Sequence, residues 1–268
     1  MICFEAFAVM ARAHNFTPDF PTADVASGLM TWMLDHPGFY PVVAEHDGRI
    51  VGSNFLDKRN RIAGVGPLTV DPAVQDKGVG RRLMADVHQH ASKNGFDGVR
   101  LVQHAYHNRS LSLYAKLGYD VREPLACLQG PPPSLAQQGR TARPAIASDL
   151  DACDRLCRQI HGHDRNGELR DAIAQGTATV VESNGRVTGY ATIIGFFGHA
   201  VGEGNDDLQA LIGAATSFAG PGFLLPTRNT ELLRWCLSQG LRVTQPLMLM
   251  TLGPYNEPSG AFLPSILY

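Results

Sequence analysis

Residues 70–83 read VDPAVQDKGVGRRL and contain the pattern Gln-x-x-Gly-x-Gly at Gln75, Gly78 and Gly80. The stretch lies between an apolar run and a segment whose apolar residues have helical spacing. Two glycines at this spacing let a ligand approach the backbone without a side chain in the way. The N–H groups that open a helix are unpaired, and the helix dipole adds partial positive charge there. The stretch therefore predicts a loop that binds a phosphate group.

Neither of the common nucleotide motifs fits this loop. The chain has no Gly-x-x-x-x-Gly-Lys-Ser/Thr run, which a P-loop requires. A dinucleotide fingerprint, Gly-x-Gly-x-x-Gly, would need a third glycine where Leu83 stands. The alternative interpretation is a tight turn from strand to helix that binds nothing.

The composition is typical of a globular protein. The chain has 268 residues, of which 44% are hydrophobic and 18% charged, enough for one large or two medium domains. A net charge of −2 gives no reason to expect binding to nucleic acid or to an anionic membrane. No apolar run is long enough to span a bilayer, and the N-terminal residues lack a basic leader. The low and odd count of five cysteines suits reduced thiols, so we expect a cytoplasmic protein. We expect the protein to be a monomer or a homodimer.

The spacing of apolar residues predicts an α/β (α+β) fold, with a mixed, mostly antiparallel sheet flanked by helices. The first half of the chain is expected to form strands at residues 40–44, 50–56, 62–70, 99–104 and 119–128. Helices are expected at 3–15, 24–34, from residue 79 to the Asn94-Gly95 stop, and at 110–117. Gly64, Gly66 and Pro67 are expected to interrupt the third strand as a bulge would.

A proline-rich stretch divides the chain. Gly130-Pro131-Pro132-Pro133 is followed by polar, mostly uncharged residues up to Gly139, which is typical of a linker. We therefore expect a first domain at 1–129, a linker at 130–139 and a second domain at 140–268.

The second half of the chain repeats the first. Val43–Gly52 and Val180–Gly189 have Glu, Gly, Arg and Gly at identical spacing, and Asn108–Tyr114 parallels Asn229–Trp235. Two copies of one fold in tandem explain this repeat. The second copy begins with an expected strand at Thr141–Pro144, whereas the first begins inside the matching helix. Either the native N-terminus lies upstream of Met1, or the first sheet lacks its first strand.

The loop in the second copy that corresponds to residues 75–81 differs in charge. It lies within residues 195–207 and has carboxylates at the helix start: Glu203, Asp206 and Asp207. It lacks the basic residues of the first loop: Lys77, Arg81 and Arg82. The carboxylates complement the helix dipole themselves and would repel a pyrophosphate. We therefore expect that the second copy is degenerate and that its loop has lost the ligand that the first loop binds.

Two motifs resemble those of the GNAT superfamily, the acyl-CoA N-acyltransferases. Residues 75–80 resemble motif A of that family, Gln/Arg-x-x-Gly-x-Gly/Ala. Asn108–Tyr119 resembles motif B, a helix that begins near an asparagine and carries Leu-Tyr-x-Lys-x-Gly-Phe/Tyr. The order and separation of the two motifs are also those of the family.

The resemblance implies acetyl-CoA as cosubstrate and a residue set that binds it. Residues at the end of the fourth strand would contact the pantetheine and polarise the acyl carbonyl, and the loop would hold the pyrophosphate. The implied set is Leu68, Thr69, Val70, Gln75, Asp76, Lys77, Gly78, Val79, Gly80, Arg81 and Asn108. Tyr114 would be the general acid that protonates the leaving thiolate, because a phenol stays protonated at neutral pH. The alternative is that Tyr114 only packs in the core.

The general base is less defined. His104 and His107 follow the fifth strand, near the expected acceptor groove, and histidine has a suitable pKa. A surface histidine without a role, or a base that acts through water, are the alternatives. Tyr114 and His104 are thus the catalytic candidates. The spacing of the ten histidines and five cysteines predicts no metal site.

We therefore expect an N-acetyltransferase that moves an acetyl group from acetyl-CoA to a primary amine by direct attack. The acceptor would be a small molecule or a peptide. It would bind near the helices at residues 3–34 and the loop at 57–60. The alternative is a non-catalytic sensor or scaffold that binds acyl-CoA without turnover.

Overall fold

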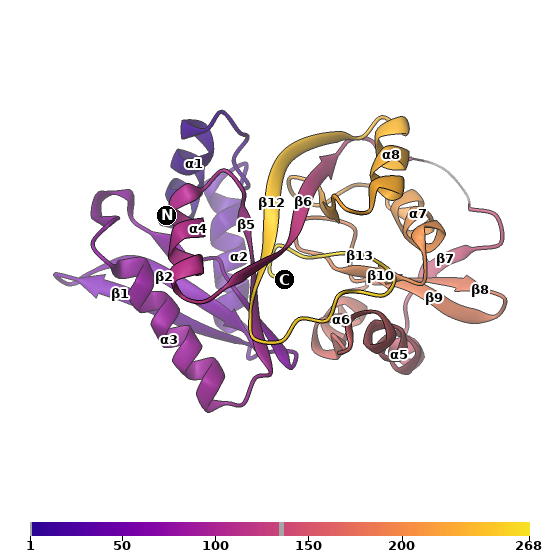
Figure 1. Ribbon diagram of the computed structural model, residues 1–268, viewed down its shortest axis with the longest axis horizontal. Helices are drawn as coiled ribbons and strands as arrows, with labels where there is room; N and C mark the ends of the chain where they lie inside the picture. The colour runs from indigo at the N-terminus through magenta and orange to yellow at the C-terminus, as the bar shows by residue number, and fades with distance from the viewer. Residues whose placement is uncertain (1, 134–136) are drawn as a thin grey trace. The chain divides into compact units, whose positions relative to one another are not determined.

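The computed structural model describes residues 2–133 and 137–268 (Figure 1). Its contacts divide the chain into two compact units. Unit 1 comprises Met1–Asp120, Met250–Pro254 and Leu267, and unit 2 comprises Val121–Leu249, Tyr255–Ile266 and Tyr268. Unit 2 thus includes a strand that we expected in the first domain, and unit 1 includes residues from near the end of the chain. The expected linker at 130–139 contains residues 134–136, which lie outside the described residues.

Unit 1 has the predicted series of elements. Its helices are α1 (Ile2–Ala13), α2 (Ala23–Asp35), α3 (Val79–Lys93) and α4 (Asn108–Lys116). Its strands are β1 (Phe39–His46), β2 (Arg49–Asp57), β3 (Ile62–Val65), β4 (Thr69–Val70), β5 (Gly98–His104) and the last residues of β12 (Arg242–Leu252). A short 3-10 turn, η1 (Pro72–Val74), lies between β4 and α3.

The sheet of unit 1 opens between β4 and β5. The strand order is β1-β2-β3-β5, followed by β12, and β4 pairs with β2. The parallel pairing of β3 with β5 covers Ile62–Gly64, after which the chain turns away at Gly66-Pro67 and pairs Val70 with Gly52 of β2. The predicted bulge is therefore a break that divides one strand into β3 and β4. The second half of β5 consequently diverges from β4.

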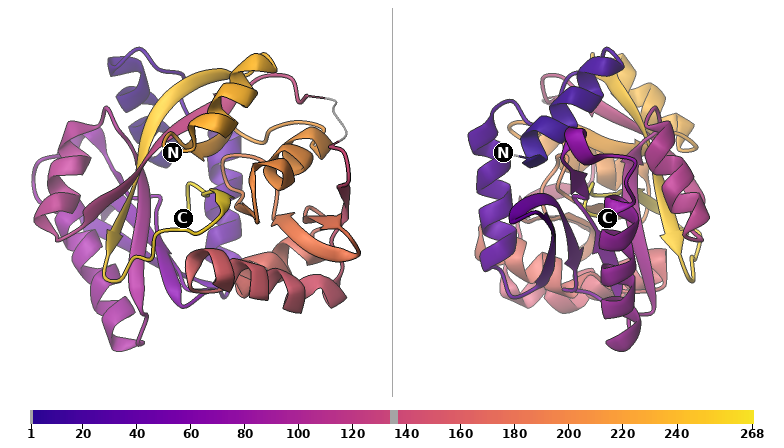
Figure 2. Two further views of the ribbon diagram at one scale, coloured as in Figure 1. Left: turned by 45° about the vertical axis from the view of Figure 1, so that its right-hand side comes forward. Right: turned by 90° about the vertical axis from the view of Figure 1, so that its left-hand side faces the viewer.

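Helices cover both faces of this sheet. α1 and α2 lie on one face, and α3 and α4 on the other (Figure 2). Apolar residues of α3, which include Met84 and Val87, pack in one cluster with Leu56 and Leu101 of the sheet. No strand precedes α1 among the described residues, and β1 lies at the edge of the sheet.

Unit 2 contains the second copy of the fold. Its helices are α5 (Leu150–His161), α6 (Asn166–Ala174), α7 (Asn205–Ala214) and α8 (Thr230–Ser238), with a 3-10 turn η2 (Ala147–Asp149). One sheet has the order β13-β10-β9-β8-β7, and β6 pairs with β11 beside the first part of β12. The strands are β6 (Asp120–Gln129), β7 (Thr141–Pro144), β8 (Thr179–Ser183), β9 (Arg186–Ala191), β10 (Ala200–Gly202), β11 (Phe223–Pro226) and β13 (Ala261–Leu263). α5 and α6 lie on one face of the five-stranded sheet, and α7 and α8 on the other (Figure 1).

The hairpins of the two units confirm the repeat. The β1–β2 register shifts between Ala44 and Glu45, and the β8–β9 register shifts at the matching place, between Val181 and Glu182. Both turns also have two residues with positive φ, which a tight hairpin turn of this kind requires. The predicted first strand of the second copy, Thr141–Pro144, is β7.

The structure corrects the alignment of the second repeated segment. His107 caps α4 and Asn229 caps α8. Each side chain accepts a hydrogen bond from the backbone N–H three residues later in the chain. A glycine in the left-handed conformation follows each helix, Gly118 after α4 and Gly240 after α8. The number of residues between the cap and this glycine is the same in both copies. Asn229 therefore corresponds to His107 rather than to Asn108. It follows that Tyr114 corresponds to Cys236.

No helix within the described residues combines the length and apolar character that crossing a membrane would require.

Candidate functional site

The glycine loop of unit 1 leaves the start of α3 open. Asp76 and Gly78 adopt left-handed backbone conformations, with φ of 64° and 82°, and α3 begins at Val79. Gly78 has no side chain to accept from the first N–H groups, and the first turn contains no acidic residue. The first four N–H groups of a helix lack partners within the helix, and the positive end of the helix dipole lies at the same place. The geometry is that of an anion-binding helix terminus.

Arg109 connects this loop to the start of α4. Its guanidinium donates to Asp76 Oδ2 at 2.9 Å and to Gln75 Oε1 at 2.5 Å, and Gln75 Nε2 donates to the Val70 carbonyl at 3.2 Å. Sequence reasoning did not identify Arg109. A cation in the first turn of a helix opposes the helix dipole, which is the signal that could have indicated an anionic ligand.

The surroundings of Gly80 would accommodate a methyl group. A Cβ atom at this position would lie 3.6 Å from Leu113 and 3.7 Å from Val70, both ordinary contacts. Packing therefore does not require glycine here, whereas close approach of a ligand to the backbone would. Other predicted residues of the loop, Lys77 and Arg81, are exposed.

Residues 68–70 lie where the sheet opens. Thr69 is buried, and its hydroxyl is 2.8 Å from that of Ser53, while Val70 pairs with Gly52. A Cβ atom at Gly52 would lie 2.7 Å from the Thr69 carbonyl oxygen, so this glycine lets β4 approach β2 closely. Leu68 is half-buried against the core of α3 and α4.

The corresponding helix start in unit 2 is occupied by the protein itself. The Asp207 carboxylate accepts from Gly204 N at 3.1 Å, from Thr188 Oγ1 at 2.7 Å and from Arg140 Nε at 2.8 Å, and it is buried. A carboxylate thus caps α7 at the place that α3 leaves open. The pocket beside it, about 480 Å³ in volume, is lined by the carboxylates Glu203 and Glu231 among others.

Tyr114 lies in the core of unit 1. It is 7% exposed, packs in the cluster that contains Leu101 and Val87, and its ring centroid is 5.9 Å from that of Tyr119. Burial raises the pKa of Tyr114 to about 12, against the lowering effect of a hydrogen bond with Ser110. The phenol is therefore protonated throughout the neutral range.

His104 forms a buried pair with Asp19. Its Nε2 lies 3.1 Å from Asp19 Oδ1, and the two side chains are 5% and 6% exposed. Tyr106 lies beside His104 with ring centroids 5.1 Å apart, and it stacks on Phe16 at 4.2 Å. Burial, and secondarily the charge of Asp19, raise the pKa of Tyr106. Sequence reasoning missed Asp19, because it lies in the irregular segment between α1 and α2, where no periodic pattern marks it.

The two other predicted residues in this region, His107 and Asn108, lie at the start of α4. His107 Nδ1 accepts from Ser110 N at 3.1 Å, and burial, with the Arg109 charge next in size, lowers the pKa of His107 to about 4. It is therefore neutral at pH 7 and serves as the cap of α4. Asn108 is exposed in the first turn of α4.

Comparison with known proteins finds a family match in the first part of the chain. Residues 8–119 match the model of the acetyltransferase (GNAT) family. No protein of curated function matches the chain at a significant level.

Three solved structures have a similar fold over nearly the whole chain. A candidate acetyltransferase from Pyrococcus horikoshii is 16% identical with a TM-score of 0.72, covering 97% of this chain and 89% of that one. A GCN5-related N-acetyltransferase from Sphaerobacter thermophilus is 16% identical with a TM-score of 0.59, covering 97% and 94%. A tandem GNAT protein from the clavulanic acid biosynthesis pathway is 14% identical with a TM-score of 0.52, covering 94% of each chain. At these identities the likeness shows the fold. Residues 8–119 thus match the acetyltransferase (GNAT) family, and the chain as a whole has the fold of these tandem acetyltransferase structures.

Proposed function

We propose that the protein is an N-acetyltransferase that uses acetyl-CoA bound to unit 1. The observation that carries this proposal is the open N-terminus of α3, with Gly78, Gly80 and Arg109 around it, in a domain that matches an acetyltransferase family. The buried carboxylate of Asp207 at the matching helix of unit 2 supports a single cosubstrate site per chain.

The cosubstrate would bind along the opening of the unit 1 sheet. The N–H groups at residues 78–81 would hold the pyrophosphate, and Arg109 and Lys77 would add positive charge. The backbone of residues 68–70 would contact the pantetheine and polarise the acyl carbonyl, because β4 separates from β5 at this point. Asn108, exposed at the start of α4, would reach the same opening.

The buried pair of His104 and Asp19 is proposed as the general base. If Asp19 accepts a hydrogen bond from Nε2–H, the Nδ1 atom carries the lone pair and can take a proton. The acceptor amine would lose its proton to this imidazole as its nitrogen attacks the thioester carbonyl. The carboxylate would orient the ring and stabilise the imidazolium that forms.

Tyr114 is proposed as the general acid. A bond forms between the amine nitrogen and the acetyl carbon, the carbon–sulfur bond breaks, and the phenol gives its proton to the leaving thiolate. The raised pKa of about 12 keeps the phenol protonated before the step. The acceptor is proposed to be a primary amine of a small molecule or peptide that reaches the Asp19 side of the site.

A second candidate function is a sensor that binds acyl-CoA without turnover. The observation that favours it is the burial of Tyr114 within an apolar cluster, where packing alone explains the side chain. In that case the Tyr114 hydroxyl has no chemical role.

A thiol-release assay over a panel of primary amines separates the two functions. An acetyltransferase releases CoA at an amine-dependent rate, and Tyr114→Phe lowers that rate while calorimetric binding of acetyl-CoA is kept. Binding of acetyl-CoA without release on any amine favours the sensor. Absence of acetyl-CoA binding to the unaltered protein contradicts both functions.

A further inference from the structure

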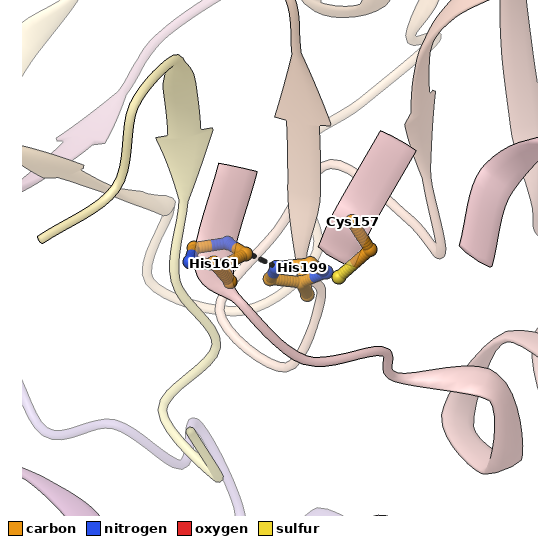
Figure 3. A group of neighbouring side chains, drawn as sticks. All are labelled: Cys157, His161 and His199. Carbon is orange, nitrogen blue, oxygen red and sulfur yellow. Dashed lines mark hydrogen bonds between the residues drawn. The ribbon is translucent and has the colours of Figure 1, made fainter. Parts of the chain in front are cut away.

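A cysteine and two histidines meet inside unit 2, away from every residue used above. Cys157, His161 and His199 are all buried, and one donor atom from each lies within 4.8 Å of the other two. The two histidines approach most closely, with their Nε2 atoms 3.3 Å apart. Figure 3 shows the ring of His199 between the sulfur of Cys157 and the ring of His161. Within the part of the chain that the structure describes, this is the group whose donor atoms could hold a metal ion.

The fold fixes two of the three side chains on one helix. Cys157 and His161 are four residues apart in α5, so they lie one above the other on the same face. α5 ends immediately after His161, at Gly162, whose φ of 79° is left-handed. His161 therefore lies in the last helical turn, facing the same core as Cys157.

The third side chain arrives from the turn before β10. The backbone of His199 is held by Thr192, whose N–H donates to the His199 carbonyl at 2.9 Å and whose hydroxyl accepts from His199 N at 3.0 Å. At Gly198 a Cβ atom would lie 1.9 Å from the Ile193 carbonyl oxygen, so only glycine permits this turn. The turn directs His199 into the core formed by α5 and the sheet.

The surroundings favour a bound cation over a simple polar contact. The cluster lies within an apolar core that includes Ile160, Tyr190 and Phe262. The Tyr190 hydroxyl is fully buried, has no hydrogen-bond partner of good geometry among the described residues, and lies beside the Cys157 thiol. It is placed to donate a hydrogen bond to a metal-bound thiolate, as outer-shell groups around metal ligands do.

We propose that Cys157, His161 and His199 bind one Zn²⁺ ion within unit 2. Thiolate and imidazole are the ligands that zinc uses in proteins, and the 3.3 Å between the two Nε2 atoms suits two tetrahedral ligands that each lie about 2.0–2.1 Å from one ion. The ion would join the last turn of α5 to the turn before β10. Its role is therefore to stabilise unit 2, independently of the acyl-CoA site in unit 1.

Sequence spacing did not predict this site. His199 lies 38 residues after His161, and a single Cys-x-x-x-His pair on a helix is a weak pattern. The third ligand is brought in by the turn geometry of Gly198, which no local motif marks. The expectation that the chain has no metal site rested on spacing alone.

The test uses the full-length protein treated with a chelator and then dialysed. Titration with Zn²⁺ against a chromophoric chelator is expected to show one ion per chain. With Co²⁺ in place of zinc, a thiolate-to-cobalt charge-transfer absorption is expected, because Cys157 is a direct ligand. Zn²⁺ at 100 times its dissociation constant is expected to raise the folded-to-unfolded ratio about 100-fold, seen as a higher melting temperature.

Matched variants locate the site. Cys157→Ser and His199→Gln should lose both the stoichiometric binding and the cobalt absorption. Cys153→Ser is the control, because Cys153 is equally buried one turn earlier in α5 but is not part of the cluster. The proposal is overturned if the unaltered protein binds no zinc or shows no thiolate–cobalt absorption. It is also overturned if the Cys157→Ser variant binds zinc as well as the unaltered protein does. The cobalt spectrum of the unaltered protein decides the question even if a variant fails to fold.

Discussion

Arg109 and Glu231 occupy the same position in the two copies of the fold, and they carry opposite charges. Arg109 lies two residues after His107, the cap of α4, and Glu231 lies two residues after Asn229, the cap of α8. Arg109 donates to the glycine loop of unit 1, whereas Glu231 accepts from Asn205 Nδ2 at 3.0 Å in unit 2. One helix start has thus kept a charge that attracts phosphate, and the other has reversed it.

The first prediction concerns this charge. The Arg109–Asp76 pair is exposed, so it contributes less than about 1 kcal/mol, and a phosphate can displace Asp76 at little cost. Arg109→Glu should weaken acetyl-CoA binding by at least roughly tenfold, since a charge-assisted hydrogen bond is worth about 1.5–3 kcal/mol. Asp76→Asn should leave affinity unchanged or improve it. Calorimetry measures both, and equal losses in the two variants would contradict the assignment. Lys93→Ala, at the far end of α3, is the control.

The second prediction concerns the proposed base. His104→Gln should lower kcat by roughly 10²–10⁴-fold while the KM for acetyl-CoA changes little, because only proton transfer is lost. Asp19→Asn should give a smaller loss, since its carboxylate acts through the ring of His104. Steady-state kinetics with an active amine measures both effects. His46→Gln, an exposed histidine on β1, should behave like the unaltered protein. Full activity of His104→Gln would rule out this base.

The third prediction separates ligand approach from stability. Gly80→Ala should leave the melting temperature nearly unchanged, because its methyl group meets only ordinary contacts, yet it should weaken acetyl-CoA binding. Gly78→Ala should instead lower stability by about 1 kcal/mol, because its φ of 82° disfavours a residue with a Cβ atom. Thermal melting and calorimetry on both variants test the pair. If Gly80→Ala binds acetyl-CoA normally, the backbone of α3 does not approach the ligand.

The fourth prediction is a pH dependence at the cap of α4. The pKa of His107 is about 4 in the folded protein, below its ordinary value of about 6.5, so the unfolded chain binds more protons between these values. Stability from this residue is therefore complete above about pH 6.5 and is lost as the pH falls towards 4. Allowing for solvent screening of a half-buried side chain, the loss should be about 2 kcal/mol.

His107→Asn isolates this effect, because asparagine caps the matching helix α8 and does not titrate. The variant should keep the stability of the unaltered protein at neutral pH and lose less on acidification. His107→Ala should be less stable by about 1 kcal/mol at every pH, because the cap itself is gone. Melting temperatures and hydrogen exchange of the α4 amides, followed from neutral to acid pH, provide the measurement. Parallel pH curves for the unaltered protein and His107→Asn would exclude the mechanism.

Local signals predicted most elements of the fold. Asp47-Gly48 and Asn184-Gly185 impose hairpins because both positions of each turn have positive φ, and the alternating apolar pattern then sets the registers. The glycine loop was predictable for the same reason, since its conformation depends on residues within it. The interruption at Gly66-Pro67 was also visible, because neither residue sustains a strand.

Features that depend on distant partners were not predictable. The assignment of β6 to unit 2 and of the end of β12 to unit 1 depends on tertiary contacts, which no local pattern in these strands encodes. Asp19 lies in an irregular segment and gains its meaning only from His104, 85 residues later. The alignment of Asn229 with Asn108 was displaced by one residue, because a histidine cap does not resemble an asparagine in sequence.

The residues Met250–Pro254 belong to unit 1, so the sheet of that unit cannot be completed until these late residues have been translated. During translation the N-terminal strands and helices of that unit emerge long before its last strand, β12, has been made. The edge of β5 therefore gains β12 as its neighbour only after residues 121–249 of unit 2 have been made. A gene divided at the proline-rich stretch would separate each half from a strand that it needs. The two copies of the fold, although repeated in sequence, are thus obliged to mature as one polypeptide.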